Sequence, residues 1–369
     1  MTPDSFSRPR VDNDVADART AALWRAAERL VELGLDDVDG ISYQGLGALA
    51  ADLLERRGSP IPHRLLHHQR MARVAAMTAP ALLTRVRAAC DGPIVLLKGP
   101  EVAERYPQRA RGYGDLDLLV PDGAHVQRAL VEDGFSEVPD PERFVGVYHL
   151  PPLILNGAPL ALEIHEAPNW PEGLTPPPSA DLIGGATESA LRLPGILAPA
   201  ASHHALLLAA HAWSHAPLGR VRDLLDVGAI LLEADDGETS RLAEAWGVPR
   251  LWQTTTEAIN ALVSGGRTWP LRLWAAHIPA VRAQNVLEEH LQRVLSPFWG
   301  YGTGFAARRS ASAFLNEFQR ASDETWPEKI GRSAVAVRRA LTPTAKHRRL
   351  LGDSATRGQR RNTPPGPLQ

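Results

Sequence analysis

The sequence predicts an α+β fold, in which a small mixed β-sheet with its own helices is flanked by N-terminal helices and a C-terminal helical domain. Three observations lead to this prediction. Apolar residues recur at helical spacing in residues 17–57 and 63–90. From about residue 93, short apolar runs bounded by glycine alternate with helical patterns, which is typical of buried strands joined by helices. Helical spacing returns from about residue 201.

Changes in composition divide the chain into six expected segments. Both ends are polar and lack periodicity, and the C-terminal end is also basic and rich in proline and glycine. The expected segments are a disordered N-terminus (1–15), N-terminal helices (16–90), the sheet-containing core (91–168), a Pro- and Gly-rich linker (169–199), a helical domain (200–341) and a disordered basic tail (342–369). We interpret the basic tail as solvated, with RNA binding as the alternative.

Composition excludes several classes of protein. The chain has 369 residues, 44% of them apolar, and a net charge of −2, so no overall basic field indicates a nucleic-acid partner. The single cysteine, Cys90, excludes an internal disulfide framework and suits a reducing compartment. The N-terminal residues lack the apolar segment of a signal peptide, and no uncharged apolar run is long enough to span a membrane. We therefore expect a cytoplasmic protein with no membrane partner.

The elements of the core can be placed from local signals. The motif Asn156-Gly157 predicts a hairpin turn. The expected order is a strand at 93–98, a helix beginning at Pro100, a strand at 114–120, a helix at 121–134 closed by Gly134, and two strands at 143–150 and 160–166.

The strand at 114–120 carries two carboxylates on one face. Asp115 and Asp117 are two residues apart, so both side chains project from the same side of the strand. Carboxylates this close repel each other unless a cation lies between them. Mg²⁺ takes carboxylate oxygens and keeps positions open for substrate phosphates. The pair therefore predicts a magnesium site, and solvated acids at an exposed strand end are the alternative.

A third carboxylate follows on the strand at 160–166. A neighbouring antiparallel strand would bring Glu163 close to the aspartate pair, and such a trio can hold two metal ions. Glu166 is the fallback if the register differs. His165 shares the face of Glu163, and it either contacts the substrate or caps the strand.

Phosphate groups need donors, and the turn after the first strand offers them. Lys98 supplies a charge, Gly99 makes the turn, and the helix that follows would present free N–H groups to an anion. Arg111 is a second candidate cation for a triphosphate or pyrophosphate. The alternative for Lys98 and Arg111 is an ordinary salt bridge to the aspartates.

These motifs together resemble a known family. The stretches "VLLKGPEVAERY", "RGYGDLDLLV" and "ALEIHE" resemble the uncharacterised bacterial nucleotidyltransferase-like proteins of the DNA polymerase beta superfamily. The stretch "HHALLLAAHAWSH", followed by "RVRDLLDVGAILL", also resembles the second half of that family. The resemblance covers roughly residues 60–260. It implies the fold of a nucleotidyltransferase core with helical flanks.

The resemblance also implies an activity. Such enzymes bind a nucleoside triphosphate such as ATP with Mg²⁺, usually two ions, and transfer the nucleoside monophosphate to a hydroxyl or similar acceptor with release of pyrophosphate. The metal-binding and catalytic roles carry over to Asp115, Asp117 and Glu163, and nucleotide binding to Lys98, Gly99, Arg111, Gly114 and His165.

One departure from the superfamily pattern leaves alternatives open. The usual Gly-Ser turn is replaced here by Lys98-Gly99, so the serine hydroxyl is lost. The alternatives are therefore a catalytically degenerate nucleotide-binding or regulatory protein, or a tRNA-modifying nucleotidyltransferase toxin. The acceptor is a small molecule, a peptide or tRNA.

The helical domain carries further polar side chains. His204, His211 and His215 share one helical face, which either packs against the core and lines its cleft or holds zinc. Asp226 either orients a substrate group or forms an ion pair between helices.

Overall fold

The computed structural model describes residues 11–139, 144, 148–318 and 324–340. Of the two ends expected to be disordered, residues 1–10 and 342–369 lie outside the described residues. Residues 11–15 belong to the first helix, which begins at Val11.

The predicted N-terminal helices are present, and the region 17–57 consists of three of them. These are α1 (Val11–Gly34), α2 (Val38–Tyr43) and α3 (Gly47–Arg56). Asp37 interrupts the helical pattern because its side chain caps α2, accepting a hydrogen bond of 3.0 Å from the backbone N–H of Gly40. Gly45, with φ of +73°, makes the turn before α3. The next helix, α4 (His63–Ala89), matches the predicted helix at 63–90 within one residue.

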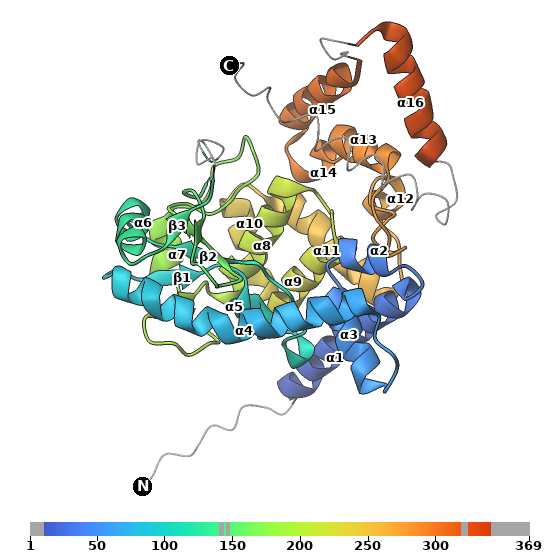
Figure 1. Cartoon of the computed structure of the whole chain (residues 1–369). Coiled ribbons are helices and arrows are strands. Elements are labelled where there is room, and N and C mark those ends of the chain that lie inside the picture. Colours follow the sequence, from blue (N-terminus) through green and yellow to red (C-terminus); the bar gives the residue numbers. More distant parts are fainter. Residues whose placement is uncertain (1–10, 140–143, 145–147, 319–323, 341–369) are drawn as a thin grey trace, which may run out of the picture.

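The predicted mixed sheet is present and has seven strands, which lie beside α6 and α7 (Figure 1). Its strand order is β3-β4-β5-β2-β1-β7-β6, with parallel pairing of β2 with β5 and of β1 with β7. The elements of this region are β1 (Ile94–Leu96), α5 (Pro100–Ala103), the 3₁₀ turn η1 (Pro107–Arg109), β2 (Asp115–Leu119), α6 (Gly123–Glu132), β3 (Ser136–Glu137), β4 (Leu153–Ile154), β5 (Ala161–His165), α7 (Ser179–Gly184), β6 (Thr187–Glu188) and β7 (Ile196–Ala198).

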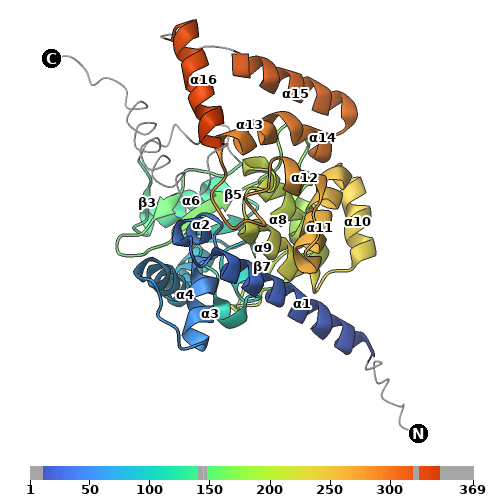
Figure 2. The same cartoon turned by 90° about the vertical axis from the view of Figure 1, so that its right-hand side faces the viewer.

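The helical region follows the sheet. It consists of α8 (Ala201–His215), α9 (Val221–Leu231), α10 (Asp236–Ala245), α11 (Pro249–Ser264), α12 (Trp269–Leu273), α13 (Val286–Leu295), α14 (Pro297–Gly300), α15 (Thr303–Phe318) and α16 (Trp326–Ala340). Helices α8 to α11 lie against the body that contains the sheet, whereas α15 and α16 project away from it (Figures 1 and 2).

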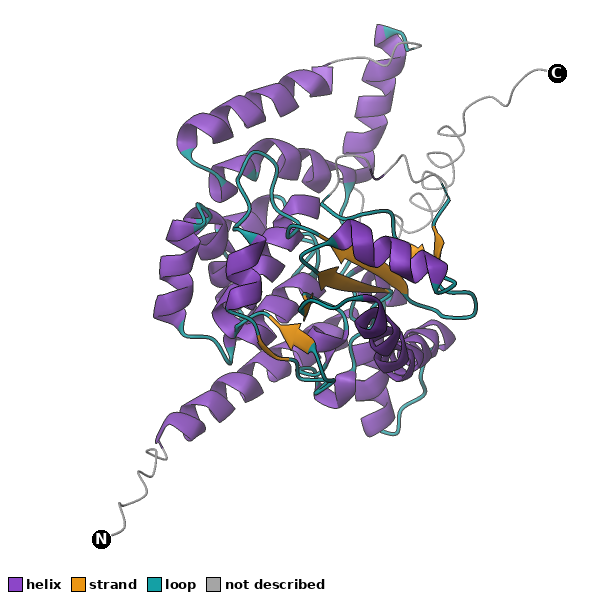
Figure 3. Ribbon diagram, turned by 90° about the vertical axis from the view of Figure 1, so that its left-hand side faces the viewer, coloured by secondary structure: helices purple, strands orange, loops and turns teal. Residues whose placement is uncertain are grey.

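The two faces of the sheet pack against different helices. Leu116 and Leu118 of β2 are fully buried in a core that includes residues of α4 and α6. Leu119, on the other face, belongs to a second core with residues of α8 and α9. Because side chains alternate along a strand, Asp115 and Asp117 point to the same face as Leu119. The acidic face of β2 therefore lies toward the helical region, while helices enclose the sheet (Figure 3).

The predicted hairpin is present, but its first strand lies elsewhere. Strand β4 pairs with β5 around a turn at Asn156-Gly157, where Gly157 has φ of +81°. The strand was predicted at 143–150, of which 143 and 145–147 lie outside the described residues. His149 forms only an isolated bridge with His165. Leu153 and Ile154, which follow the predicted strand, are the residues that pair with β5.

The segment 169–199, predicted as a linker, differs from that expectation. It contains α7 and the strands β6 and β7, and β7 pairs in parallel with β1. Strand β7 has only three apolar residues, and Pro194 and Pro199 lie close to its ends. Such a short run next to prolines does not predict a strand from sequence.

Within the described residues, no helix combines the length and the apolar character needed to cross a membrane.

The buried side of β2 should dominate stability. We expect Leu118→Ala to lower the free energy of unfolding by about 2–5 kcal/mol, because it leaves a cavity beneath α4 and α6. The matched control, Leu33→Ala, changes a side chain that is 71% exposed and should change that free energy by no more than about 0.5 kcal/mol. Urea unfolding of both variants measures the difference, and equal effects would contradict this account of the core.

Candidate metal and nucleotide site

Parallel pairing of β2 and β5 brings the predicted acids together. The Cα partners are Asp115 with Ala161 and Asp117 with Glu163. Directly paired residues project from the same face of a sheet. The predicted antiparallel pairing of these strands is wrong, although the parallel register also places Glu163 beside Asp117.

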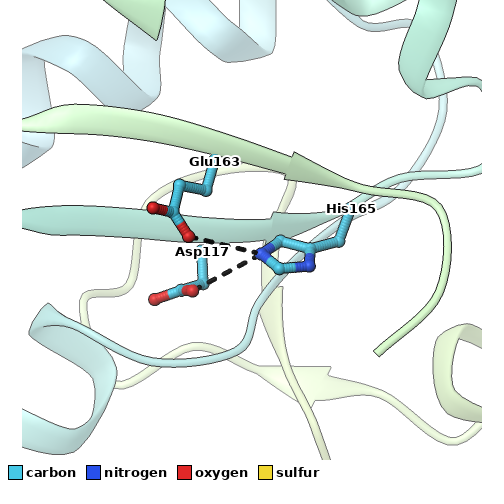
Figure 4. Close-up of side chains that lie close together, drawn as sticks. All are labelled: Asp117, Glu163 and His165. Carbon is cyan, nitrogen blue, oxygen red and sulfur yellow. Dashed lines mark ion pairs between the residues drawn. The ribbon is translucent and has the colours of Figure 1, made fainter. Parts of the chain in front are cut away.

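Three side chains converge at this point (Figure 4). The Nε2 atom of His165 lies 3.4 Å from Oδ1 of Asp117 and 3.9 Å from Oε2 of Glu163. One ligand atom from each residue lies within 4.8 Å of the other two. Two carboxylates and an imidazole at these separations are a donor set that divalent metal ions bind in proteins.

Buried atoms without partners support a cation at this position. Asp117 and His165 are almost fully buried, and neither Oδ2 of Asp117 nor the ring nitrogens of His165 have a hydrogen-bond partner by distance and angle. Unsatisfied buried polar atoms are costly, so a cation bound here would stabilise the site. The residues present therefore fit a divalent ion. His165 is placed beside the carboxylates, and it does not cap the strand end.

The carboxylates differ in their protonation. Burial by itself would raise the pKa of Asp117, but the neighbouring His165 ring and Lys98 outweigh it, so the pKa lies below its usual range. Burial and then the charge of Asp117 raise the pKa of Asp115. For Glu163, burial and the two aspartates together raise the pKa to about 7. In the absence of a metal ion, Asp117 thus carries the charge and Glu163 holds a proton near neutral pH.

His149, which was not predicted as a site residue, lies beside Glu163 and His165. Its Nε2 lies 3.9 Å from Oε2 of Glu163, and its ring centroid is 5.3 Å from that of His165. The available signal was its place at the end of the predicted strand 143–150, two residues before a proline.

Lys98 lines a pocket together with Asp117 and His165. The pocket lies between the sheet and α8, and it is lined by Leu97, Lys98, Asp117, His165, Pro168, Asn169, Leu207, Leu208 and His211. The positive charge of Lys98 acts on all three carboxylates: it helps to lower the pKa of Asp117 and opposes the rise in the pKa of Asp115 and Glu163.

Gly99 follows Lys98 and passes close to β2. Its φ is +66°, and a Cβ at this position would lie 3.0 Å from the carbonyl oxygen of Asp115, so glycine is required. The helix that it introduces, α5, has only four residues and begins with Pro100. Glu101 in its first turn is fully buried and accepts a hydrogen bond of 2.5 Å from Ser189 Oγ. The expected helix N-terminus is thus a single turn that already carries a carboxylate.

Arg111 contacts a different acid from the one expected. Its Nε and Nη2 donate hydrogen bonds of 2.7 Å to the two carboxylate oxygens of Asp226 on α9. Its Nη1 also donates to the carbonyl oxygen of Gly99 over 3.3 Å, and Tyr106 donates a bond of 2.7 Å to Asp226. Burial opposes ionisation of Asp226, but Arg111 outweighs it and the pKa falls to about 2. Asp226 therefore forms an ion pair with the loop before β2.

Gly114 has a backbone role in this arrangement. Its carbonyl oxygen accepts a hydrogen bond of 3.0 Å from Ala161, which extends the pairing of β2 with β5. A Cβ at Gly114 would meet no other atom within 4 Å.

Of the three α8 histidines predicted to share a face, His204 is buried in the core, His211 is partly buried and His215 is exposed. His204 donates a hydrogen bond of 2.8 Å from Nε2 to the carbonyl oxygen of Leu97, and burial lowers its pKa to about 3. His211 lines the pocket beside Asp117, while Nε2 of His215 accepts a hydrogen bond of 3.1 Å from Asn169. In the described part of the chain, the cluster of acids and histidines with metal-ligand geometry is the one at Asp117, and it does not include these three histidines.

The buried ion pair leads to a stability prediction. Asp226→Ala leaves the Arg111 guanidinium buried without its partner and should lower the free energy of unfolding by about 3–5 kcal/mol. The control Asp223→Ala removes a partly exposed carboxylate 3.8 Å from Arg222, and a change of at most about 1 kcal/mol is expected. The double variant Arg111→Met/Asp226→Leu should recover much of the loss. Urea unfolding checks this, and similar losses for Asp226→Ala and Asp223→Ala would refute it.

The raised pKa of Glu163 leads to a prediction about pH. Its folded value of about 7 exceeds its ordinary value of 4.5, so between these pH values the folded state binds more protons than the unfolded state. In the absence of metal, the contribution of Glu163 to stability therefore falls as pH rises through this window.

A divalent ion binds the ionised carboxylate, so Mn²⁺ or Mg²⁺ should raise the melting temperature more at pH 8 than at pH 6. Glu163→Gln should remove most of this difference, whereas Glu166→Gln, a change to an exposed acid, should keep it. Thermal melts with and without the ion test this, and an equal or larger effect at pH 6 would count against it.

Comparison with known proteins adds one finding. A family described as uncharacterised nucleotidyltransferase matches residues 39–263, which is more than half of the chain. The match runs from α2 to α11 and includes every strand of the sheet. It bears out the family resemblance in the sequence. No curated protein and no solved structure matches the chain.

Proposed function

The chain belongs to the uncharacterised nucleotidyltransferase family, and from this we propose that it is a Mg²⁺-dependent nucleotidyltransferase. The reaction moves a nucleoside monophosphate from a nucleoside triphosphate such as ATP to a hydroxyl or similar acceptor. The acceptor oxygen forms a bond to the α-phosphorus, the bond from that phosphorus to the bridging oxygen breaks, and pyrophosphate leaves. We assign this reaction to the cytoplasm.

The convergence of Asp117, Glu163 and His165 is the observation that carries the proposal. A structural role for these residues would leave their polar atoms paired with one another or with the backbone, yet Oδ2 of Asp117 is buried without a partner. Asp115 lies on the same face of β2 and its charge interacts with that of Asp117. Carboxylates on two adjacent strands can therefore share divalent ions.

Asp115, Asp117 and Glu163 would hold the metal ions, with His165 as a further ligand. When bound, Mg²⁺ supplies charge neutralisation for the phosphates and for the carboxylates that bind it. Lys98 would bind the phosphate chain as a point charge from the edge of the pocket. Glu163 lies beside Asp117 and would take the proton of the acceptor hydroxyl as the new bond to phosphorus forms.

The acceptor would enter from the side of the helical region. Asp115 and Asp117 face α8 and α9, and His211 and Asn169 line the same pocket as Lys98. A small molecule, a peptide and tRNA remain the classes of acceptor that we propose.

A second candidate is a protein that binds the nucleotide without transferring it. The single-turn helix α5 and the missing Gly-Ser turn favour this alternative, because fewer backbone N–H groups are offered to the phosphates. It predicts metal-dependent nucleotide binding with no pyrophosphate release in the presence of any acceptor.

Calorimetric titration of nonhydrolysable nucleoside triphosphates tests the proposal. With Mg²⁺ or Mn²⁺ present we expect binding that Asp117→Asn and Glu163→Gln weaken by roughly 100-fold, because each removes a charged metal ligand. The control Glu166→Gln should bind like wild type, since this exposed side chain contacts the start of α6. Metal-dependent binding that survives Asp117→Asn would exclude this site.

A further inference from the structure

We propose that Arg222, near the start of α9, is a ligand for the phosphate chain of the donor nucleotide. The helical region would then add a positive charge to the nucleotide-binding site, where the sheet region supplies only Lys98. This inference rests on the proposed function and assigns to the site a residue from outside the predicted phosphate-binding turn.

The need for another cation follows from the position of Arg111. Arg111 was expected to bind phosphate, but its Nε and Nη2 donate to Asp226 of α9 and its Nη1 donates to the carbonyl oxygen of Gly99. Its charge is neutralised within the protein. Lys98 is then the core cation at the carboxylates, and a triphosphate carries more negative charge than one lysine balances.

Arg222 lies on α9, within electrostatic reach of Asp115 and Asp226. It lies one turn before Asp226 on α9, so the two side chains share a helical face, and that face contacts the loop before β2. The charge of Arg222 reaches both Asp115 and Asp226, where it favours the ionised carboxylates. A phosphate chain at the acidic pair would therefore lie between Lys98 of the core and Arg222 of α9.

The guanidinium of Arg222 is not saturated by the protein. Its Nε is buried without a hydrogen-bond partner, and its ion pair with Asp223 spans 3.8 Å. In Arg111, by contrast, the Nε atom donates a hydrogen bond of 2.7 Å to the carboxylate of Asp226. A buried donor without an acceptor is costly, and a ligand that accepts its hydrogen bond would remove that cost. Phosphate oxygens suit the fork of donors that arginine presents.

The surrounding structure fixes Arg222 in place. The backbone N–H of Arg222 donates to the carbonyl oxygen of Gln44 over 3.1 Å, and Val221 donates to the Gln44 side chain over 2.8 Å. Gln44 is fully buried and donates in turn to the carbonyl oxygen of Arg282. Gly45 has φ of +73°, and a Cβ there would lie 2.9 Å from Cβ of Arg222, so the glycine makes room for the arginine stem. Such preorganisation lowers the entropic cost of binding a ligand.

A purely structural role makes a different prediction. If Arg222 only balances the charges of Asp115 and Asp226, its loss would alter stability and metal affinity and leave the binding of phosphates to the metal-loaded protein unchanged. Binding of the metal alone and binding of the phosphate chain therefore have to be measured separately.

The experiment uses inorganic tripolyphosphate, which is independent of the donor base, with Mn²⁺ as the metal. Calorimetry of the full chain gives the Mn²⁺ affinity first and the tripolyphosphate affinity of the Mn²⁺-loaded protein second. For Arg222→Gln we expect roughly 10- to 100-fold weaker tripolyphosphate binding, because a charge-assisted hydrogen bond to the phosphate is lost. The Mn²⁺ affinity should be unchanged. The control Arg241→Gln, on the exposed side of α10, should behave as wild type.

The outcomes separate this inference from the proposed function. Two results would overturn the role of Arg222 and leave the proposed function standing. One is that Arg222→Gln binds tripolyphosphate as tightly as wild type, and the other is that it loses Mn²⁺ and tripolyphosphate binding to the same extent. No binding of tripolyphosphate or of any nucleoside triphosphate by the wild type overturns both proposals. If Arg222→Gln does not fold, Arg222→Lys serves instead. Several-fold weaker tripolyphosphate binding is then expected, because lysine lacks the bidentate fork, and an unchanged affinity overturns the inference.

Discussion

The parallel pairing of β2 with β5 is the constraint on which the site depends. It sets Asp117 directly opposite Glu163 and leaves His165 two residues further along the same face. Leu116 and Leu118 are buried on the opposite face, so a shift of one residue would bury the acids under α4 and expose the leucines to the pocket. The packing of apolar side chains on one face of the sheet therefore fixes the positions of polar side chains on the other. The same pairing continues through Gly114, whose carbonyl binds Ala161.

Burying these carboxylates is unfavourable, and the protein offsets it in two ways. Asp117 stays ionised because His165 and Lys98 outweigh the effect of burial, whereas Glu163 gains a proton near neutral pH. This division lowers the repulsion between acids that share one face. The arrangement remains incomplete within the protein alone, since Oδ2 of Asp117 has no partner. A site that is unfavourable without its cation is well suited to binding one, because the ion relieves repulsion that is already present.

Two buried contacts join the sheet to the helical region beside this site. The first is the pair of Arg111 with Asp226, and the second is the hydrogen bond from His204 to the carbonyl oxygen of Leu97. Leu97 immediately precedes Lys98, and Gly99 binds Arg111, so both contacts act on the turn that carries the candidate phosphate ligands. The family match ends at residue 263, within α11. The part shared with the family thus contains the sheet, the acids and both contacts, and α12 to α16 lie beyond it.

The sequence by itself determined the elements with strong local signals and the identity of the acidic residues. The strand "DLDLL", the helix at 63–90 and the turn at Asn156-Gly157 were predictable because periodicity and turn chemistry are local properties. The tertiary structure decided which strands are neighbours and in which direction they run, so the parallel pairing, strand β7 within the supposed linker and the position of His149 could not be read from spacing. It also decided the partner of Arg111, which lies 115 residues away in the chain. Long-range pairing depends on how separate apolar faces pack together, and no local pattern contains that information.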